Sequence, residues 1–196
     1  MARPRSIDDP ELMAKLSGVF REEGYDGASL ADLARAAGLQ KASLYHRFPG
    51  GKAQMADEAL ADALAWFADN VLVHLNGAGA PRARLDEALA NLAVFYDDGR
   101  LACLLNMLSA PEGRKRPFDS GVKAGFAALT DGFAKVARDA GATGKSADSR
   151  AIRAVALLHG GLVMARGMGD TRPFSECLSA IPETLLADTL HEGDTR

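Results

Sequence analysis

A run of eight residues, KASLYHRF, contains side chains that suit contacts with a nucleic acid. Ala42 and Ser43 are small enough to approach base edges, where alanine can touch a thymine methyl group and serine can donate or accept a hydrogen bond. Tyr45, His46 and Arg47 can reach phosphate oxygens, and an arginine can alternatively pair with guanine. These residue types in this order predict contacts with double-stranded DNA.

A short helix is needed to present these side chains. Leu44 and Phe48 are four residues apart and face inward, which leaves Lys41 and the residues named above on the remaining surface. The helix cannot continue past Phe48, because Pro49 disfavours helix at the residue before it and two glycines follow. Lys52 begins the next helix, where it is placed for a further phosphate contact.

Two helices are predicted before this one. Asp9 and the proline after it suit the first turn of a helix, whose apolar residues recur on one face until Gly24 stops it. Ser29 is placed to cap a second, alanine-rich helix that ends at Gly38, and to turn the start of that helix toward the DNA backbone. A short capped helix, a tight turn and a second short helix form a helix-turn-helix, whose second helix enters the major groove.

Composition favours an all-α fold for the whole chain. Alanine and leucine together supply 62 residues, whereas valine and isoleucine supply 11, and this balance favours helix over strand. Three short helices are followed by longer ones, so we expect an N-terminal arm and DNA-binding domain at 1–51 and a larger helical domain at 52–196. About nine helices are predicted in total.

Apolar repeats and turn residues locate the helices of the larger domain. They are expected at about 52–75, 82–97, 118–140, 147–168 and 173–190, with a shorter apolar segment, LACLLNMLSA, between the second and the third. The last two should pack as a pair. Four glycines toward the end of the first of this pair would each cost about 1 kcal/mol against alanine, a cost that close helix–helix approach or fraying would offset.

The net charge of −3 hides a basic segment. Residues 27–52 carry a local charge of +3, whereas residues 53–196 carry −4. The basic segment coincides with the expected helix-turn-helix, where a phosphate backbone would attract it.

The sequence indicates a cytoplasmic protein without membrane association. The N-terminus has no apolar core of the kind that a secretory signal needs, and no run approaches the roughly 18 consecutive apolar residues of a membrane span. Cys103 and Cys177 lie far apart without CxxC spacing or a histidine cluster, which argues against a disulfide framework and a zinc site.

No catalytic motif is found, so we predict that the chain is not an enzyme and uses no metal or cofactor. GxSxG, HExxH and paired His/Cys motifs are absent, and GATGKS lacks the spacing and the preceding strand of a phosphate-binding loop. Five side chains are candidates for a ligand cavity in the larger domain, although core packing explains them equally well. They are Trp66, Phe95, Cys103, Met107 and Phe126.

The segment GYDGASLADLARAAGLQKASLYHRFPGGK resembles the DNA-binding signature of the tetracycline-repressor (TetR) family of bacterial transcription regulators. The likeness covers about residues 9–60 and includes the Gly-aromatic turn, the capping serine and the Leu-Tyr-His-x-Phe helix that ends before a lysine. It implies that six residues match positions that commonly contact DNA, namely Ala42, Ser43, Tyr45, His46, Arg47 and Lys52.

The resemblance also implies a homodimer that represses nearby genes until a small-molecule effector releases it from a palindromic operator. We expect the dimer contact in the last two helices, about 147–168 and 173–190. Two alternatives stay open. One is an activator with the same DNA-binding unit, and the other is a helical small-molecule-binding protein or enzyme without DNA-binding function.

The segment departs from the family pattern at two places. Gln40 replaces the usual serine or threonine cap of the DNA-reading helix, which would weaken that cap, and FPGGK is one residue longer than the common FPSK form, which would alter the reach of Lys52. Cys103, in ACLLNM, resembles the position of a reactive cysteine in some electrophile-sensing members. It is either a reactive sensor or a buried inert thiol.

Overall fold

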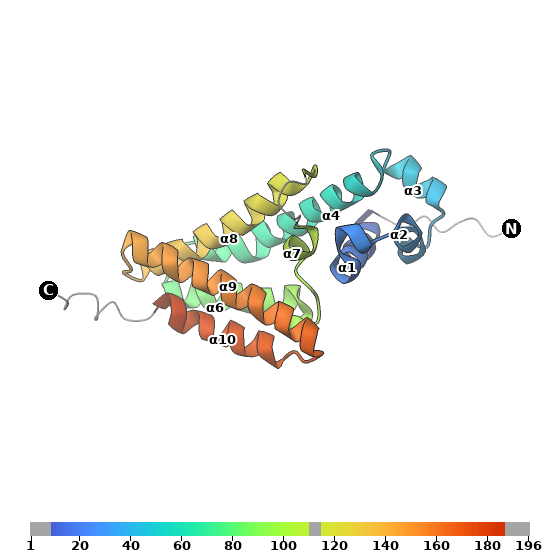
Figure 1. The fold of residues 1–196 in the computed structure, drawn as a ribbon. Helices are drawn as coiled ribbons and strands as arrows, with labels where there is room; N and C mark the ends of the chain where they lie inside the picture. The colour runs from blue at the N-terminus through green and yellow to red at the C-terminus, as the bar shows by residue number, and fades with distance from the viewer. Residues whose placement is uncertain (1–8, 110–114, 187–196) are drawn as a thin grey trace. The chain divides into compact units, whose positions relative to one another are not determined.

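The computed structural model describes residues 9–109 and 115–186, and every regular element in these ranges is helical (Figure 1). Nine helices are present there when the three consecutive helical segments between residues 51 and 76 are counted as one. The all-α fold predicted from the alanine and leucine content is confirmed.

Packing divides the chain into two compact units. Among the described residues, the N-terminal unit consists of 9–65, 103–109 and 115–124, and the C-terminal unit consists of 66–102 and 125–186. A segment from the middle of the sequence therefore belongs with the helix-turn-helix, which the sequence did not indicate. The functional boundary expected at residue 52 stays a prediction.

Helix α1, Asp9–Gly27, begins at the predicted Asp-Pro pair and is kinked near its end. Gly24 adopts a φ of 69°, which glycine tolerates and other residues rarely adopt, and the last turn runs on to Gly27. A Cβ atom at position 24 would also lie 3.3 Å from the carbonyl oxygen of Met107 in helix α7, Leu104–Leu108. Gly24 therefore bends α1 and lets α7 pack closely against it.

Three consecutive segments form the helix that the sequence predicted over 52–75. They are α4, Gly51–Phe67, a π-helical turn, Ala68–Leu72, and α5, Val73–Asn76. In the widened turn the Asn70 Nδ2 atom donates to the carbonyl oxygen of Trp66 at 2.8 Å. The π-helical turn was not predicted, because the apolar pattern extends across it without a break.

The remaining helices follow the predicted ranges closely. They are α6, Pro81–Phe95, α8, Asp119–Asp139, α9, Gly144–Met168, and α10, Arg172–Leu186. A short 3-10 turn follows α6. The last four residues of the second predicted dimer helix, 187–190, lie outside the described residues.

Helices α9 and α10 lie side by side and antiparallel in the C-terminal unit (Figure 1). A Cβ atom at Gly161 would lie 2.9 Å from the Cys177 Cβ atom, so glycine at this position allows the two helices to approach. Gly160 and Gly167 differ, because Cβ atoms there would meet nothing within 4 Å. Close packing within one chain therefore accounts for Gly161, and Gly160 and Gly167 lie on an open face of α9.

Each unit has its own apolar core. Buried side chains of the N-terminal unit include Leu16, Phe20, Leu33, Leu44, Phe48, Met55 and Phe118. Buried side chains of the C-terminal unit include Leu75, Leu85, Leu92, Tyr96, Phe133, Leu158, Phe174 and Ile181. Most apolar positions whose helical spacing predicted the elements lie in these cores, but Ile152 and Val163 of α9, which the spacing placed with the buried Leu162, are each 61% exposed.

Of the described helices, α9 alone is long and apolar enough for a membrane span by length and composition, with a mean hydropathy of 1.2 over its most apolar window. Core helices of globular proteins meet the same test, and 39% of this window is buried inside the protein.

Candidate nucleic-acid interface

Helix α2, Leu30–Ala37, is capped as the sequence predicts. The Ser29 Oγ atom accepts the N–H of Asp32 at 3.2 Å, and the Asp32 carboxylate accepts the N–H of Ser29 at 3.3 Å, which together form a capping box. The hydrogen bond with the Ser29 side chain is the main cause of a lowered pKa for Asp32. At the other end, Gly38 has a φ of 66° and terminates the helix. Local bonds thus define both ends of α2.

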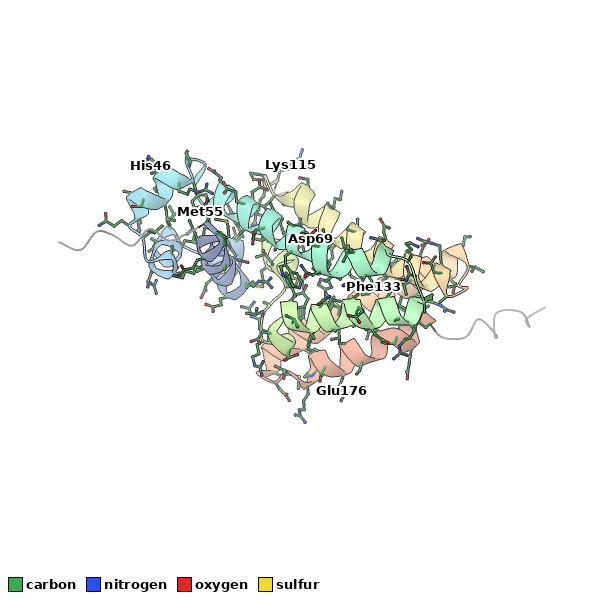
Figure 2. The ribbon with its side chains drawn as sticks, turned by 180° about the vertical axis from the view of Figure 1, so that it is seen from behind. His46, Met55, Asp69, Lys115, Phe133 and Glu176 are labelled. Carbon is green, nitrogen blue, oxygen red and sulfur yellow. The ribbon has the colours of Figure 1, made fainter. Side chains whose placement is uncertain are left out.

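Helix α3, Lys41–Arg47, turns its apolar side chains inward and its polar ones outward. Leu44 and Phe48 are each 0% exposed, whereas Tyr45 is 49% exposed. Figure 2 shows His46 on the outer side of α3 and Met55 among the packed side chains behind it. The other outward residues are Lys41, Ala42, Ser43, His46 and Arg47. The predicted division of α3 into an anchored face and an exposed face is confirmed, while contact with DNA stays a prediction.

The N-cap of α3 is weak. Gln40 occupies this position in an extended conformation, and its side chain makes no capping hydrogen bond. The replacement of the usual serine or threonine therefore removes a side-chain acceptor from the first turn, as expected from the sequence. Helix α3 depends for its position on Leu44 and Phe48 instead.

Arg47 contacts two carboxylates in this structure, and neither contact was predicted from the sequence. Its Nε atom lies 3.4 Å from Asp9 Oδ1 at the start of α1, and its Nη2 atom lies 3.2 Å from Glu58 Oε2 in α4. The guanidinium group also lies over the Phe48 ring, 4.7 Å from its centroid. The Arg47 side chain is still 40% exposed, so it remains accessible to a phosphate.

Lys52 also has protein partners. Its Nζ atom donates to the carbonyl oxygens of Tyr25 and Ala28 at 2.7 and 2.9 Å, and it lies 4.5 Å from the centroid of the Tyr25 ring. An ammonium group has three N–H donors, so one donor remains for a phosphate. Lys52 therefore joins the end of α1 to the start of α4, in addition to the DNA contact that we predict for it.

The structure divides the five predicted ligand residues between the two units. Trp66 and Phe95 stack in the C-terminal unit with ring centroids 4.8 Å apart, and Phe126 in the same unit packs against His159 at 5.0 Å. Cys103 and Met107 belong to the N-terminal unit. Trp66 and Phe95 thus stack ring on ring, while Cys103 and Met107 are joined by a backbone hydrogen bond, from Met107 N–H to the Cys103 carbonyl oxygen at 3.0 Å.

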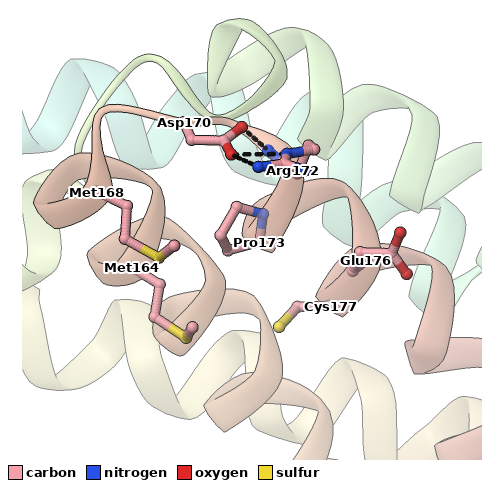
Figure 3. Close-up of a pocket in the computed structure, with 7 residues that line it drawn as sticks. All are labelled: Met164, Met168, Asp170, Arg172, Pro173, Glu176 and Cys177. Carbon is pink, nitrogen blue, oxygen red and sulfur yellow. Dashed lines mark hydrogen bonds and ion pairs between the residues drawn. The ribbon is translucent and has the colours of Figure 1, made fainter.

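Cys103 is 3% exposed and stands directly before α7. A thiol so far from solvent has the environment expected of the inert alternative rather than of a reactive sensor. Cys177 is half-buried and lines an open pocket of about 360 Å³ (Figure 3). The pocket lies between the end of α9 and the start of α10, and none of the five predicted ligand residues lines it. Its lining residues are Met164, Met168, Asp170, Arg172, Pro173, Glu176 and Cys177.

Residues 14–59 match a known family, described as bacterial regulatory proteins, tetR family. The matched range runs from α1 into α4 and includes both helices of the helix-turn-helix. It therefore contains every side chain of the candidate interface except Asp9.

Similarity to known proteins extends over most of the chain. The HTH-type transcriptional regulator LmrA of Bacillus subtilis is 20% identical over 183 residues, which cover 89% of this chain and 95% of LmrA. A TetR transcriptional regulator from Legionella pneumophila has the same fold with a TM-score of 0.75 at 20% identity, over 92% of this chain and 99% of that one. The TetR family regulator CifR was crystallised as a cysteine mutant with a 26-bp double-strand operator DNA. Its structure matches this one with a TM-score of 0.71 at 25% identity, over 94% of this chain and 99% of CifR.

Proposed function

We propose that this chain, which belongs to the tetR family of bacterial regulatory proteins, represses transcription by placing α3 in the major groove of an operator and dissociates when a small-molecule effector binds. It is a DNA-binding transcriptional regulator rather than an enzyme, and its macromolecular partner is DNA. The observation that carries the proposal is the exposed polar face of α3, anchored from behind by Leu44 and Phe48.

The contacts are assigned from the chemistry of each exposed side chain. Ala42 and Ser43 lie at the start of α3, where small side chains permit approach to base edges. Tyr45 and His46 reach phosphates, and Arg47 reaches a phosphate or a guanine. Three more residues contact the backbone: Ser29 at the start of α2, Lys41 at the start of α3 and Lys52 in the first turn of α4.

A second copy of the chain is proposed to cover the open face of α9. Ile152 and Val163 are each 61% exposed on this face, with Ala156 and Gly160 between them and Gly167 after them at helical spacing. A contiguous exposed apolar surface is costly in water and marks an interaction site, and glycines let a second helix approach closely. Met164 and Met168, which line the pocket in Figure 3, extend this surface.

Dimerisation determines the form of the DNA site. Two copies related by a twofold axis present two copies of α3, which read a palindrome whose half-sites lie about 34–36 Å apart. An effector that favours a different separation of the two helices weakens operator binding, and a coupling of about 1–3 kcal/mol is enough for such regulation. Helix α4 runs from one unit into the other and is the proposed connection.

The effector is proposed to bind in the C-terminal unit beside the stacked pair of Trp66 and Phe95. Both rings are half-buried, so they have surface left for a bound molecule. The π-helical turn begins two residues after Trp66, and such turns are frequent at functional sites. Phe126 is assigned to the same unit as a further candidate.

The test is a gel shift with DNA from upstream of the chain's own gene. The wild-type protein should form a complex that resists nonspecific competitor DNA at about 150 mM salt. A Tyr45→Ala, Arg47→Ala double variant should lose this complex while keeping its native mass and helicity. Arg82→Ala, an exposed arginine on α6, serves as the control and should bind normally.

Two outcomes would reject the proposal. A wild-type protein without any competitor-resistant complex would favour the helical small-molecule-binding alternative. Undiminished binding by the double variant would show that the DNA contact lies elsewhere on the chain.

A further inference from the structure

A chain of hydrogen bonds links the turn after α3 to the Arg47 side chain. The Gly50 N–H donates to Gln54 Oε1 at 2.8 Å, and Gln54 Nε2 donates to Glu58 Oε1 at 2.7 Å. The other carboxylate oxygen of Glu58, Oε2, lies 3.2 Å from Arg47 Nη2. Glu58 therefore uses one oxygen for Gln54 and the other for the guanidinium group.

The spacing of the residues explains why the chain can form. Gln54 and Glu58 are four residues apart on α4, so their side chains are neighbours on one face of the helix. A Cβ atom at Gly50 would lie 3.1 Å from both the Cβ and the Oε1 atoms of Gln54. Glycine at this position, in the turn that is one residue longer than the family form, therefore leaves room for the Gln54 amide.

The free protein holds Arg47 in a position where a phosphate would compete for the same N–H groups. Glu58 is 33% exposed and Asp9 is 71% exposed, so both ion pairs are partly solvated and therefore weak. Gln54 orients Glu58, whereas no hydrogen bond from another side chain orients Asp9 among the described residues. Glu58 is thus the better-held competitor of the two.

We propose that Glu58, oriented by Gln54, is a positioning residue that competes with DNA phosphate for Arg47 and so limits affinity for DNA of any sequence. The proposal rests on the proposed function, because it requires Arg47 to face DNA. When the duplex binds, Arg47 exchanges a carboxylate for a phosphate. The Glu58 carboxylate keeps its bond from Gln54 and is solvated by water once the guanidinium group has left it.

Glu58→Gln should raise affinity for operator and for nonspecific duplex alike. The gain expected at about 150 mM salt is about two- to fivefold, the range for one partly exposed ion pair. The plot of log K against log salt concentration should steepen by less than about 0.9, because salt screens the competing Arg47–Glu58 pair in the wild type and the variant lacks that pair. Both quantities come from fluorescence anisotropy titrations of labelled duplexes between about 50 and 200 mM salt.

Asp57→Asn is the matched control for charge. It removes one negative charge at the neighbouring position, and the exposed Asp57 side chain makes no ion pair or hydrogen bond with the described residues. Glu58→Asp is the control for geometry, because it keeps the charge but withdraws the carboxylate from Arg47. If the contact with Arg47 matters, the DNA affinity and salt slope of Glu58→Asp should resemble those of Glu58→Gln. If only the charge matters, they should resemble those of the wild type.

A double-mutant cycle decides whether Glu58 acts through Arg47. In an Arg47→Gln background, Glu58→Gln should change neither the affinity nor the salt slope beyond the effect of Asp57→Asn. Equal effects of Glu58→Gln and Asp57→Asn in the wild-type background would overturn the proposal, and so would a full effect of Glu58→Gln without Arg47. These results presuppose wild-type operator binding, whose absence would instead overturn the proposed function.

Discussion

The Lys52 ammonium group lies 2.7 Å from the carbonyl oxygen of Tyr25 and 4.5 Å from the centroid of the Tyr25 ring. Arg116 lies over the same ring at 4.6 Å and pairs with Asp26 at 2.7 Å. Two cations from distant parts of the sequence thus hold the last turn of α1, directly before Ser29 caps α2. The position of the helix-turn-helix therefore depends on the Tyr25 contacts as well as on the local caps.

Lys52→Met should destabilise the N-terminal unit. The variant keeps an apolar stem but loses two hydrogen bonds from a charged group and one cation–π contact, so the free energy of unfolding should fall by about 1–3 kcal/mol. Denaturant unfolding followed by circular dichroism measures the loss. Hydrogen exchange should locate it in the last turn of α1 and in α2.

Lys41→Met is the control for this variant. The Lys41 side chain is exposed and makes no ion pair or hydrogen bond in the part of the chain that the structure describes, so its replacement should change stability by less than about 0.5 kcal/mol. Unchanged stability of Lys52→Met would show that the Tyr25 contacts contribute nothing to holding α1.

Val163→Asp should convert the proposed dimer into a monomer. A carboxylate at this position would be buried without a partner when a second α9 covers the apolar face, which is unfavourable by several kcal/mol. Sedimentation velocity or light scattering measures the mass, and circular dichroism checks that the helices remain. The affinity for a palindromic operator should fall with the mass, because one copy of α3 reaches one half-site.

Val94→Asp is the control for Val163→Asp, because it adds the same charge to an exposed valine outside the proposed dimer interface. Val94 is 72% exposed on α6, more than the 61% of Val163, so the same substitution meets a similar environment in the single chain. Dissociation by both variants, or by neither, would contradict the placement of the dimer contact on α9.

Asp139→Asn should lower the free energy of unfolding at neutral pH and should reduce the loss of stability that the protein shows as the pH falls. The carboxylate accepts hydrogen bonds from Lys135 at 2.7 Å and from Arg84 at 2.6 Å, and the Arg84 side chain is 6% exposed. The Lys135 bond is the largest cause of a lowered pKa for Asp139, followed by the Arg84 bond. The amide of asparagine can still accept a hydrogen bond but carries no charge to pair with the buried guanidinium, and Asp139 is 37% exposed, so we expect a loss of about 1 kcal/mol at pH 7.

The sign of the pH dependence follows from the lowered pKa. A carboxyl group whose pKa is lower in the folded state contributes stability above its unfolded value, near pH 4, and loses it as the pH falls through the folded value. The wild type should therefore lose more stability than Asp139→Asn between about pH 5 and pH 2. Asp131→Asn, at an exposed position of the same helix, should retain the wild-type pH profile, and an identical profile for Asp139→Asn would contradict the assignment.

Much of the candidate interface could be predicted because its signals act over a few residues. The Ser29 cap, the left-handed Gly38 and the inward pair of Leu44 and Phe48 depend on hydrogen bonds and side-chain directions within one or two helical turns. Such local relationships can be predicted from the residue types and their spacing in the sequence.

The partners of the charged side chains could not be predicted in the same way. Arg47 meets Asp9 across 38 positions of sequence, and Lys52 meets the Tyr25 carbonyl across 27. Long flexible side chains reach whichever opposite charge the packing brings near, and composition does not identify that group. The four-residue spacing of Gln54 and Glu58 can be recognised in the sequence. That the Glu58 carboxylate lies beside Arg47 is known only from the position of α3.

By itself, the sequence determined the all-helical fold, the two short helices of the helix-turn-helix and the outward polar face of α3, because each follows from propensity, capping and apolar periodicity. The tertiary structure alone decided that residues 103–109 and 115–124 pack with the helix-turn-helix, that Arg47 and Lys52 already have protein partners, and that Gly160 and Gly167 face open space. Those features depend on how separate helices pack together, and helix packing joins residues that no local pattern connects.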